Sequence, residues 1–238
     1  MRRIAFLCAA ACVFAGAALA QQSPEMQQKI AAARQAAAQN QQALHTYSWV
    51  STTQILVKGD VKDAKVEQCQ YAPDGTVQKT ELSDSQAQQQ EQQSSRRRRG
   101  RVKESIVKKK TGEMQEEMKS AAALVESYVP PSSDRIQAVV AAKGVSLQPD
   151  SGGQAVLTFA NYQKSGDSLT LTLDTTTHAL VHVSVDTYLD DPSKKVTLDV
   201  TFESLPDGTS YPATTVLAIP GDQIEVHIAN SNYEKLSH

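Results

Sequence analysis

The sequence is poor in cysteine and in aromatic residues. Among its 238 residues there are only 3 Cys, 11 Gly and 9 Pro, and aromatic side chains make up 5%. So few cysteines exclude a disulfide-dense scaffold, and glycine without a fixed period excludes a collagen-like chain. The hydrophobic content of 40% is nevertheless enough for a substantial core, and the length favours a single domain.

The first twenty residues have the order of a secretory signal peptide. Arg2 and Arg3 precede an apolar stretch over residues 4–19, and an Ala-Leu-Ala sequence stands directly before Gln21. The apolar stretch is shorter than the roughly 20 residues with which a helix crosses a bilayer. We therefore expect residues 1–20 to be a cleaved signal peptide; the alternative is an uncleaved N-terminal membrane anchor.

Export would determine both the compartment and the cysteine chemistry of the mature chain. We expect residues 21–238 to form one soluble α+β domain located in the periplasm. Cleavage would leave Cys69 as the only cysteine, so no disulfide could form within the chain. We expect Cys69 to be a packed or inert thiol, because no base or cationic setting for a reactive one is evident.

The charge is unevenly distributed. Without Arg2 and Arg3 the chain has 22 basic and 26 acidic residues, a net charge of −4. Residues 96–110 nevertheless hold nine basic side chains against one acidic one. We name the nine the basic strip: Arg96, Arg97, Arg98, Arg99, Arg101, Lys103, Lys108, Lys109 and Lys110.

The basic strip predicts an anionic partner. An exported chain meets anionic membrane surfaces, and each basic side chain near such a surface contributes about 1 kcal/mol of attraction. The strip lacks the interleaved aromatic residues of a nucleic-acid-binding surface, so we expect no nucleic acid partner. The alternatives are an envelope protein as partner, and a solvated linker without a partner.

The first part of the mature chain predicts a helix followed by strands. Apolar residues recur at helical spacing over residues 23–45. The period then changes to two over residues 47–58 and 61–71, which flank a candidate two-residue turn at Gly59–Asp60. A third short strand is expected over residues 76–82.

The middle of the chain predicts an insertion and two helices. Residues 83–101 are rich in Gln, Ser and Arg and bury too little to repay their ordering entropy, so we expect a flexible insertion there. Helical spacing returns over residues 102–129, interrupted by Gly112. Ser132 or Ser133 could cap a third helix that stops near Gly144.

The last third predicts half-buried antiparallel strands, because apolar and polar residues alternate there. The alternation is clearest over residues 168–173, 181–185, 196–203 and 224–228. The apolar face of these strands needs a cover, and the amphipathic helices are the other large apolar surfaces. We therefore predict an α+β fold in which a curved antiparallel β-sheet, a half-barrel, carries amphipathic helices on its concave face. A β-sandwich is the alternative.

Catalytic signatures are absent from the sequence. It contains no zinc-ligand spacing, no glycine-rich phosphate loop and no Gly-x-Ser-x-Gly nucleophile motif. His182 and His227 fall on the polar faces of their strands, where we expect solvated side chains rather than a metal or general-base site. We therefore expect a protein that is not an enzyme and that uses no cofactor or metal.

The order of elements resembles the LolA-like superfamily of periplasmic lipoprotein carriers and related envelope proteins. That order is a signal peptide, a helix, an early hairpin, two mid-chain helices and a C-terminal meander. Residues 188–192 and 204–212 resemble segments of an exported bacterial family. The Gln- and Arg-rich insertion departs from the carriers, so their specific sorting role does not transfer with the resemblance.

The resemblance implies that the protein binds a lipid, an acyl chain or another apolar ligand between sheet and helices. The two methionines among the implied lining residues are adaptable side chains suited to such a ligand. The alternatives are a non-enzymatic envelope scaffold with a filled core and a hydrolase with an unrecognised site. The expected lining residues are Met114, Met118, Val125, Leu171, Val183, Leu198, Val200, Phe202 and Val226.

Overall fold

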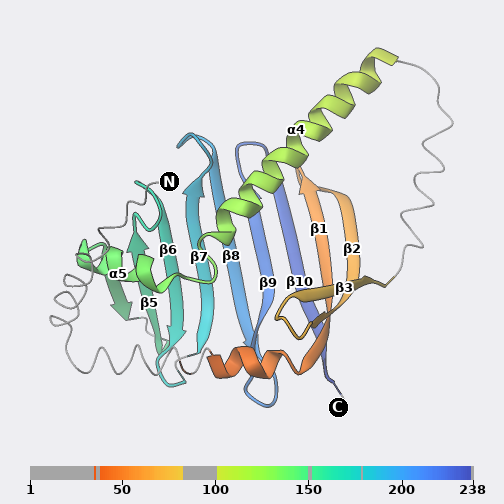
Figure 1. Cartoon of the computed structure of the whole chain (residues 1–238). Helices are drawn as coiled ribbons and strands as arrows, with labels where there is room; N and C mark the ends of the chain where they lie inside the picture. Colours follow the sequence, from red (N-terminus) through yellow and green to blue (C-terminus); the bar gives the residue numbers. More distant parts are fainter. Residues whose placement is uncertain (1–34, 36–37, 83–100, 150–151, 178, 237–238) are drawn as a thin grey trace, which may run out of the picture.

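The computed structural model describes residues 35, 38–82, 101–149, 152–177 and 179–236, and every structural statement below concerns these residues. Ten strands form one open, curved sheet (Figure 1). In chain order they are β1 (Tyr47–Val57), β2 (Asp60–Tyr71), β3 (Val77–Glu81), β4 (Val145–Pro149), β5 (Gln154–Ala160), β6 (Ser168–Asp174), β7 (Leu180–Tyr188), β8 (Lys195–Ser204), β9 (Ser210–Ile219) and β10 (Ile224–Lys235).

Every neighbouring pair in the sheet is antiparallel. The spatial order is β3-β2-β1-β10-β9-β8-β7-β6-β5-β4, so the last seven strands form a continuous meander. The first hairpin joins that meander through β1, which pairs with β10. The single curved sheet confirms the predicted fold class, and the sandwich alternative is wrong.

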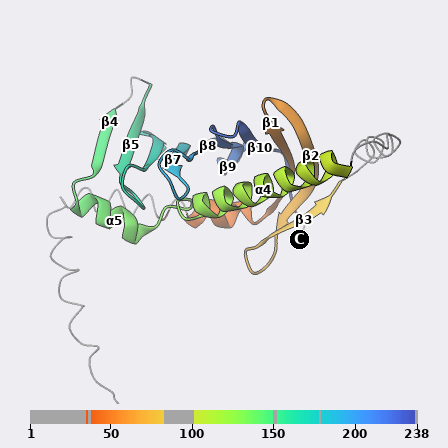
Figure 2. The same cartoon turned by 90° about the horizontal axis from the view of Figure 1, so that it is seen from above.

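Two helices lie on the same side of the sheet (Figure 2). Helix α4 (Arg101–Glu126) crosses the sheet obliquely, and its first turns extend past the sheet beyond β1 (Figure 1). Helix α5 (Ser133–Ala141) packs against β5. A shorter helical segment over residues 38–44 lies across one end of the strands (Figure 1). The rest of the predicted N-terminal helix lies outside the described residues.

Several local predictions need correction. The turn between β1 and β2 is Lys58–Gly59, one residue earlier than expected, and both residues have positive φ, as a tight hairpin turn of this kind requires. Helix α4 runs through Gly112 without a break. Ser132 stands at the start of α5, but its side chain makes no capping hydrogen bond. The predicted insertion lies outside the described residues except for Arg101, which begins α4.

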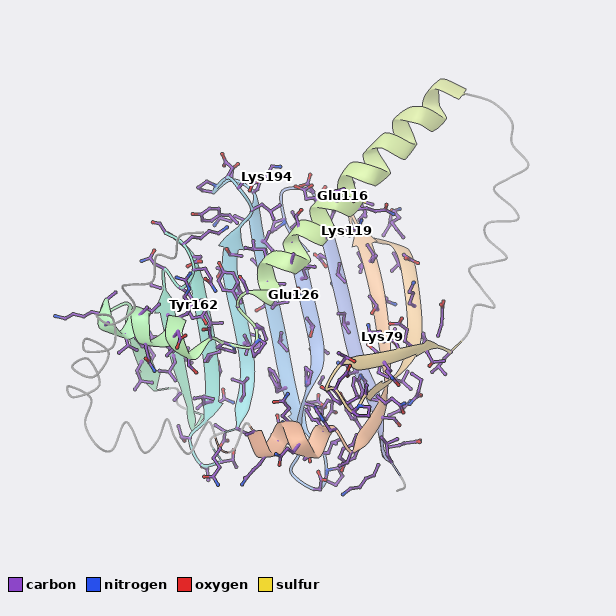
Figure 3. The ribbon with its side chains drawn as sticks, viewed as in Figure 1. Lys79, Glu116, Lys119, Glu126, Tyr162 and Lys194 are labelled. Atoms are coloured by element: carbon purple, nitrogen blue, oxygen red, sulfur yellow. The ribbon has the colours of Figure 1, made fainter. Side chains whose placement is uncertain are left out.

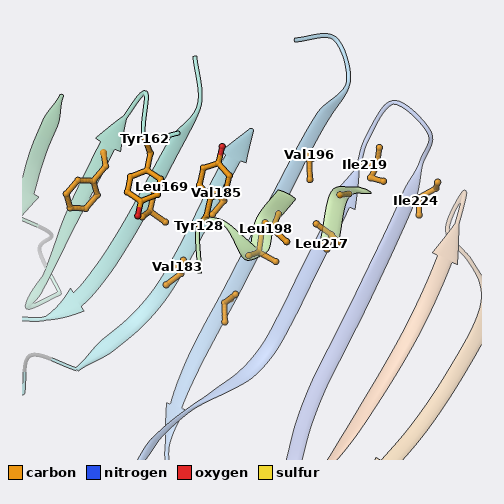
Figure 4. Packing of buried hydrophobic residues seen from close by; sticks show 14 of the residues in the cluster. Tyr128, Tyr162, Leu169, Val183, Val185, Val196, Leu198, Leu217, Ile219 and Ile224 are labelled. Atoms are coloured by element: carbon orange, nitrogen blue, oxygen red, sulfur yellow. The ribbon is translucent and has the colours of Figure 1, made fainter. Parts of the chain in front are cut away.

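The main core lies between α4, α5 and the sheet. The helical side of this core is a stripe of three buried residues at helical spacing. Ala121 and Val125 belong to the C-terminal end of α4, and Tyr128 lies just beyond it. On the sheet, Leu169, Val183 and other side chains from alternate positions of β6 to β10 meet this stripe (Figure 4). This part of the helix-covered face is therefore closely packed.

A second, smaller core consists mainly of aromatic rings. Trp49 stacks on Tyr233 with ring centroids 5.7 Å apart, and Tyr233 contacts Tyr211 at 4.3 Å. On the other side Tyr71 contacts Trp49 at 5.2 Å and stacks on His45 at 4.4 Å. These rings come from β2, β1, β10 and β9, and His45 follows directly after the 38–44 segment. Their contacts therefore fix the first hairpin to the end of the meander.

We expect Gly112→Ala to stabilise the protein by about 0.5–1 kcal/mol, because glycine inside a helix is entropically costly. A methyl group at this position meets no atom within 4 Å. The measurement is the free energy of unfolding in urea. Gly144→Ala is the contrasting variant, since its methyl would lie 2.9 Å from Val139 Cγ1 and 3.0 Å from the Ala160 carbonyl oxygen. A loss of stability in Gly112→Ala would contradict the continuous helix.

Asp207 should make the stability depend on acid pH. Hydrogen bonds from the Tyr47 and Thr209 side chains lower the pKa of Asp207 from 3.8 to about 2. Because the pKa is lower in the folded chain, the ionised carboxylate stabilises the fold above pH 3.8, and this contribution is lost as the pH falls towards about 2. Unfolding curves of Asp207→Asn should therefore depend less on pH over this interval than those of the exposed-site control Asp222→Asn. Equal pH dependence in the two variants would contradict this role for Asp207.

Candidate ligand-binding face

Six of the predicted lining residues lie on the sheet face that α4 covers, and the other three, Met114, Met118 and Val125, belong to α4 itself. Two cross-strand rows run over this face. One joins Leu169, Val185, Leu198, Leu217 and Val226 in register. The other joins Leu171, Val183 and Val200 and continues into Thr215, so the second row becomes polar towards β9.

The nine predicted residues fall into two groups. Val125, Val183, Leu198 and Val200 are buried in the main core, with exposures between 0% and 8%. Those four side chains are packed against protein. The other five are only partly buried and lie against the edge of that core: Met114, Met118, Leu171, Phe202 and Val226. The margin of the core is therefore apolar but incompletely covered, and only this margin could take a ligand without unpacking the interior.

A buried polar network holds the C-terminal end of α4 on the sheet. The Tyr128 hydroxyl donates to Asp167 Oδ2 at 2.5 Å and lies 2.7 Å from Thr187 Oγ1. All three side chains are buried. Asp167 also accepts backbone N–H bonds from Gln163 and Lys164. Burial, together with the Asp167 carboxylate, raises the pKa of Tyr128 well above its ordinary value, so the hydroxyl stays protonated and donating.

Further bonds fasten the same end of the helix to the loop between β5 and β6. Gln163 Nε2 donates to the Ser127 carbonyl at 2.7 Å, and the Ser132 backbone N–H donates to the Tyr162 hydroxyl at 2.8 Å. Figure 3 shows Tyr162 beside the start of α5 and Glu126 at the end of α4. Sequence reasoning did not anticipate this network.

A groove lies beside α4, with a volume of about 1070 Å³. One wall is the polar side of α4, including Glu116 and Glu117. The other is formed by Lys164 from the β5–β6 loop and by Asp190 and Lys194 from the β7–β8 loop. The walls meet at one ion pair, in which Lys194 Nζ lies 3.6 Å from Glu117 Oε1. The sequence contained no signal for this groove, because its two walls are far apart along the chain.

The basic strip divides between two parts of the chain. Arg96, Arg97, Arg98 and Arg99 lie outside the described residues. Arg101, Lys103, Lys108, Lys109 and Lys110 belong to the first turns of α4, the part of the helix that extends past the sheet (Figure 1). The backbone of these five residues is therefore helical rather than part of an extended linker.

The remaining candidates from the sequence lie apart from the ligand-binding face. Cys69 is buried, and its burial raises the pKa of its thiol, which disfavours the reactive thiolate. His182 on β7 lies 3.5 Å from Asp199 on β8, and His227 lies 2.6 Å from Glu225 on the same strand, β10. In the described part of the chain, no three His, Cys, Asp or Glu side chains are grouped so that they could hold a metal ion.

None of the helices in the described ranges is both long and apolar enough to span a membrane. Comparison of the chain with protein-family models, with curated proteins and with solved structures found no match.

Proposed function

We propose that this protein binds a lipid, an acyl chain or another apolar ligand at the margin of the core beneath α4, and that it acts in the cell envelope as a non-enzymatic carrier. The observation that carries the proposal is the incomplete cover of Met114, Met118, Leu171 and Phe202, which line the face between helix and sheet. Burying an acyl chain there gains about 0.8 kcal/mol per CH₂ group. Methionine side chains adapt to ligands of varied shape.

The way α4 is held supports the same proposal. Its C-terminal end is fixed through Tyr128 and Asp167, whereas its N-terminal turns extend past the sheet. A small displacement about the fixed end would uncover Met114 and Met118 before it disturbed Ala121 or Val125. A ligand could therefore enter without loss of the main core.

The alternative function is an envelope scaffold without a ligand. The four fully buried residues among the predicted lining favour it, because packed side chains already fill that part of the face. The two proposals differ in one observable. Native mass spectrometry of the protein purified from an exporting cell should show a bound lipid for a carrier and the bare chain for a scaffold.

A matched pair of helix variants tests where the ligand binds. Met118→Lys places a charge at the apolar margin, while Gln115→Lys places the same charge on an exposed position of the same helix. We expect the first to weaken binding of a fluorescent fatty acid at least about tenfold, because an unpaired charge is costly to bury. The second should leave binding unchanged. Circular dichroism would verify the fold of both, and equal binding by the two would overturn the proposed site.

We also propose that the basic strip brings the carrier to an anionic membrane surface. The favouring observation is that five of its residues belong to the first turns of α4, the part of the helix that extends past the sheet. Replacing Arg96 to Arg99 by Ser should reduce cosedimentation with phosphatidylglycerol vesicles at low salt. Unchanged cosedimentation would overturn this part of the proposal.

A further inference from the structure

The groove beside α4 borders the apolar margin of the core. Leu124 of α4 and Leu189 of the β7–β8 loop line the groove, and both also pack against the main core. The groove is thus polar at its rim and apolar where it meets the interior. Its volume of about 1070 Å³ lies just above the usual range for small-molecule sites.

Lys164 provides a fixed positive charge on one wall. Its ammonium group donates to the Tyr188 carbonyl and, at 2.9 Å, to the Leu189 carbonyl, and it lies 4.1 Å from the centre of the Tyr188 ring. Carbonyl oxygens and a ring face orient an ammonium group, but unlike a carboxylate they leave its net charge in place. Lys194, on the same wall, adds a second and more exposed ammonium group.

The opposite wall is negative, whereas the lysine wall also holds Asp190 and so carries a formal net charge of +1. Glu116 and Glu117 of α4 both line the groove. Glu117 contacts Lys194 across the groove at 3.6 Å, and Glu116 pairs with Lys119 on its own helix. The Glu116–Lys119 pair is exposed and the Lys194–Glu117 pair is only partly buried, so both contribute little free energy and a ligand can exchange them at low cost.

From this arrangement we propose that the groove binds a zwitterionic headgroup that combines an anionic phosphate with an ammonium group. The phosphate lies between Lys164 and Lys194, and the ammonium group lies against Glu116 and Glu117. The inference rests on the proposed apolar-ligand function, because Leu124 and Leu189 would lead the attached acyl chains from the headgroup towards the core margin. It adds the class of ligand: an aminophospholipid rather than a free fatty acid or an anionic lipid.

The test uses headgroups without acyl chains. Glycerophosphoethanolamine, glycerol phosphate and ethanolamine are titrated separately into the ¹⁵N-labelled chain and followed by NMR. We expect the zwitterion to shift the amide signals of Glu117, Leu189 and Lys194, and to bind at least about tenfold more tightly than either single-charge compound. Equal affinity for glycerol phosphate, or no shifts at the groove, would overturn the proposal.

Single substitutions test which charged side chains of the groove contact the headgroup. Lys194→Gln and Glu116→Gln should each weaken glycerophosphoethanolamine binding by about three- to tenfold, since each removes one charged contact. Lys62→Gln removes a similarly exposed lysine on β2 and should leave the affinity for glycerophosphoethanolamine unchanged. Unchanged binding in both groove variants would also overturn the proposal. These probes have no acyl chain, so they test the headgroup site alone. If none of them binds, the proposal of fatty-acid binding at the core margin is unaffected. If fatty acids do not bind, the headgroup result is likewise unaffected.

Discussion

Asp167→Ala is expected to lower the free energy of unfolding by about 2–4 kcal/mol. The substitution removes the acceptor of the Tyr128 hydroxyl and of the Gln163 and Lys164 backbone N–H groups, in a region where Asp167 itself is only 3% exposed. Donors that are left without an acceptor away from water are costly. Urea denaturation monitored by circular dichroism would measure the loss.

Two comparisons show whether the network accounts for that loss. Asp186→Ala removes an exposed aspartate from β7 and should cost less than about 0.5 kcal/mol. Tyr128→Phe removes only the hydroxyl and should cost about 1–3 kcal/mol. The combined loss in Tyr128→Phe with Asp167→Ala should be smaller than the sum of the single losses, because the two side chains share one hydrogen bond. Strict additivity would contradict the network.

Leu169→Ala is expected to lower the free energy of unfolding by about 2–5 kcal/mol. Leu169 has no exposed surface and lies in the cross-strand row between Phe159 and Val185. Truncation would leave a cavity where β6 meets the helix layer. The neighbouring side chains on β5 and β7 are held by the sheet register, so they cannot move in to fill it. Thermal and urea unfolding would both report the change.

The control for Leu169 is Leu147→Ala on the edge strand β4. Leu147 is 59% exposed, so the same chemical change removes little buried surface. We expect a loss below about 0.5 kcal/mol in this variant. Similar losses in the two variants would contradict the assignment of the core to the helix-covered side of β6.

The sequence alone was sufficient for the sheet class because alternation is a local signal. Leu169, Leu171 and Leu173 alternate with polar residues, and their strand is β6 in the structure. Strands with weaker alternation were missed. β5 contains consecutive apolar residues, β4 is only five residues long, and β9 contains Pro212 followed by several small residues. In each of these strands the pairing partners, rather than the pattern within the strand, determine the structure.

The ligand-binding face was predicted only in part. Alternation correctly placed Val183 and Leu171 on one face, but it could not distinguish the buried Val183 from the half-buried Leu171. That difference depends on where α4 crosses the sheet. The crossing in turn depends on the contact between Tyr128 and Asp167, which are 39 residues apart in the chain. Contacts of this kind leave no periodic trace in a sequence.

The pairing of β1 with β10 has a consequence for how the chain acquires its structure. Tyr47 is in register with Lys235, so the first strand of the sheet can pair with its neighbour only after almost 190 further residues have been synthesised. Loop closure over such a separation is entropically costly, and high contact order slows folding. The meander from β4 to β10 can assemble through sequence-local hairpins, and the N-terminal hairpin then docks onto its finished edge. Until that last step, the backbone groups along the free side of β10 remain available to any other extended segment, so this is the stage at which a chaperone would protect the protein most effectively.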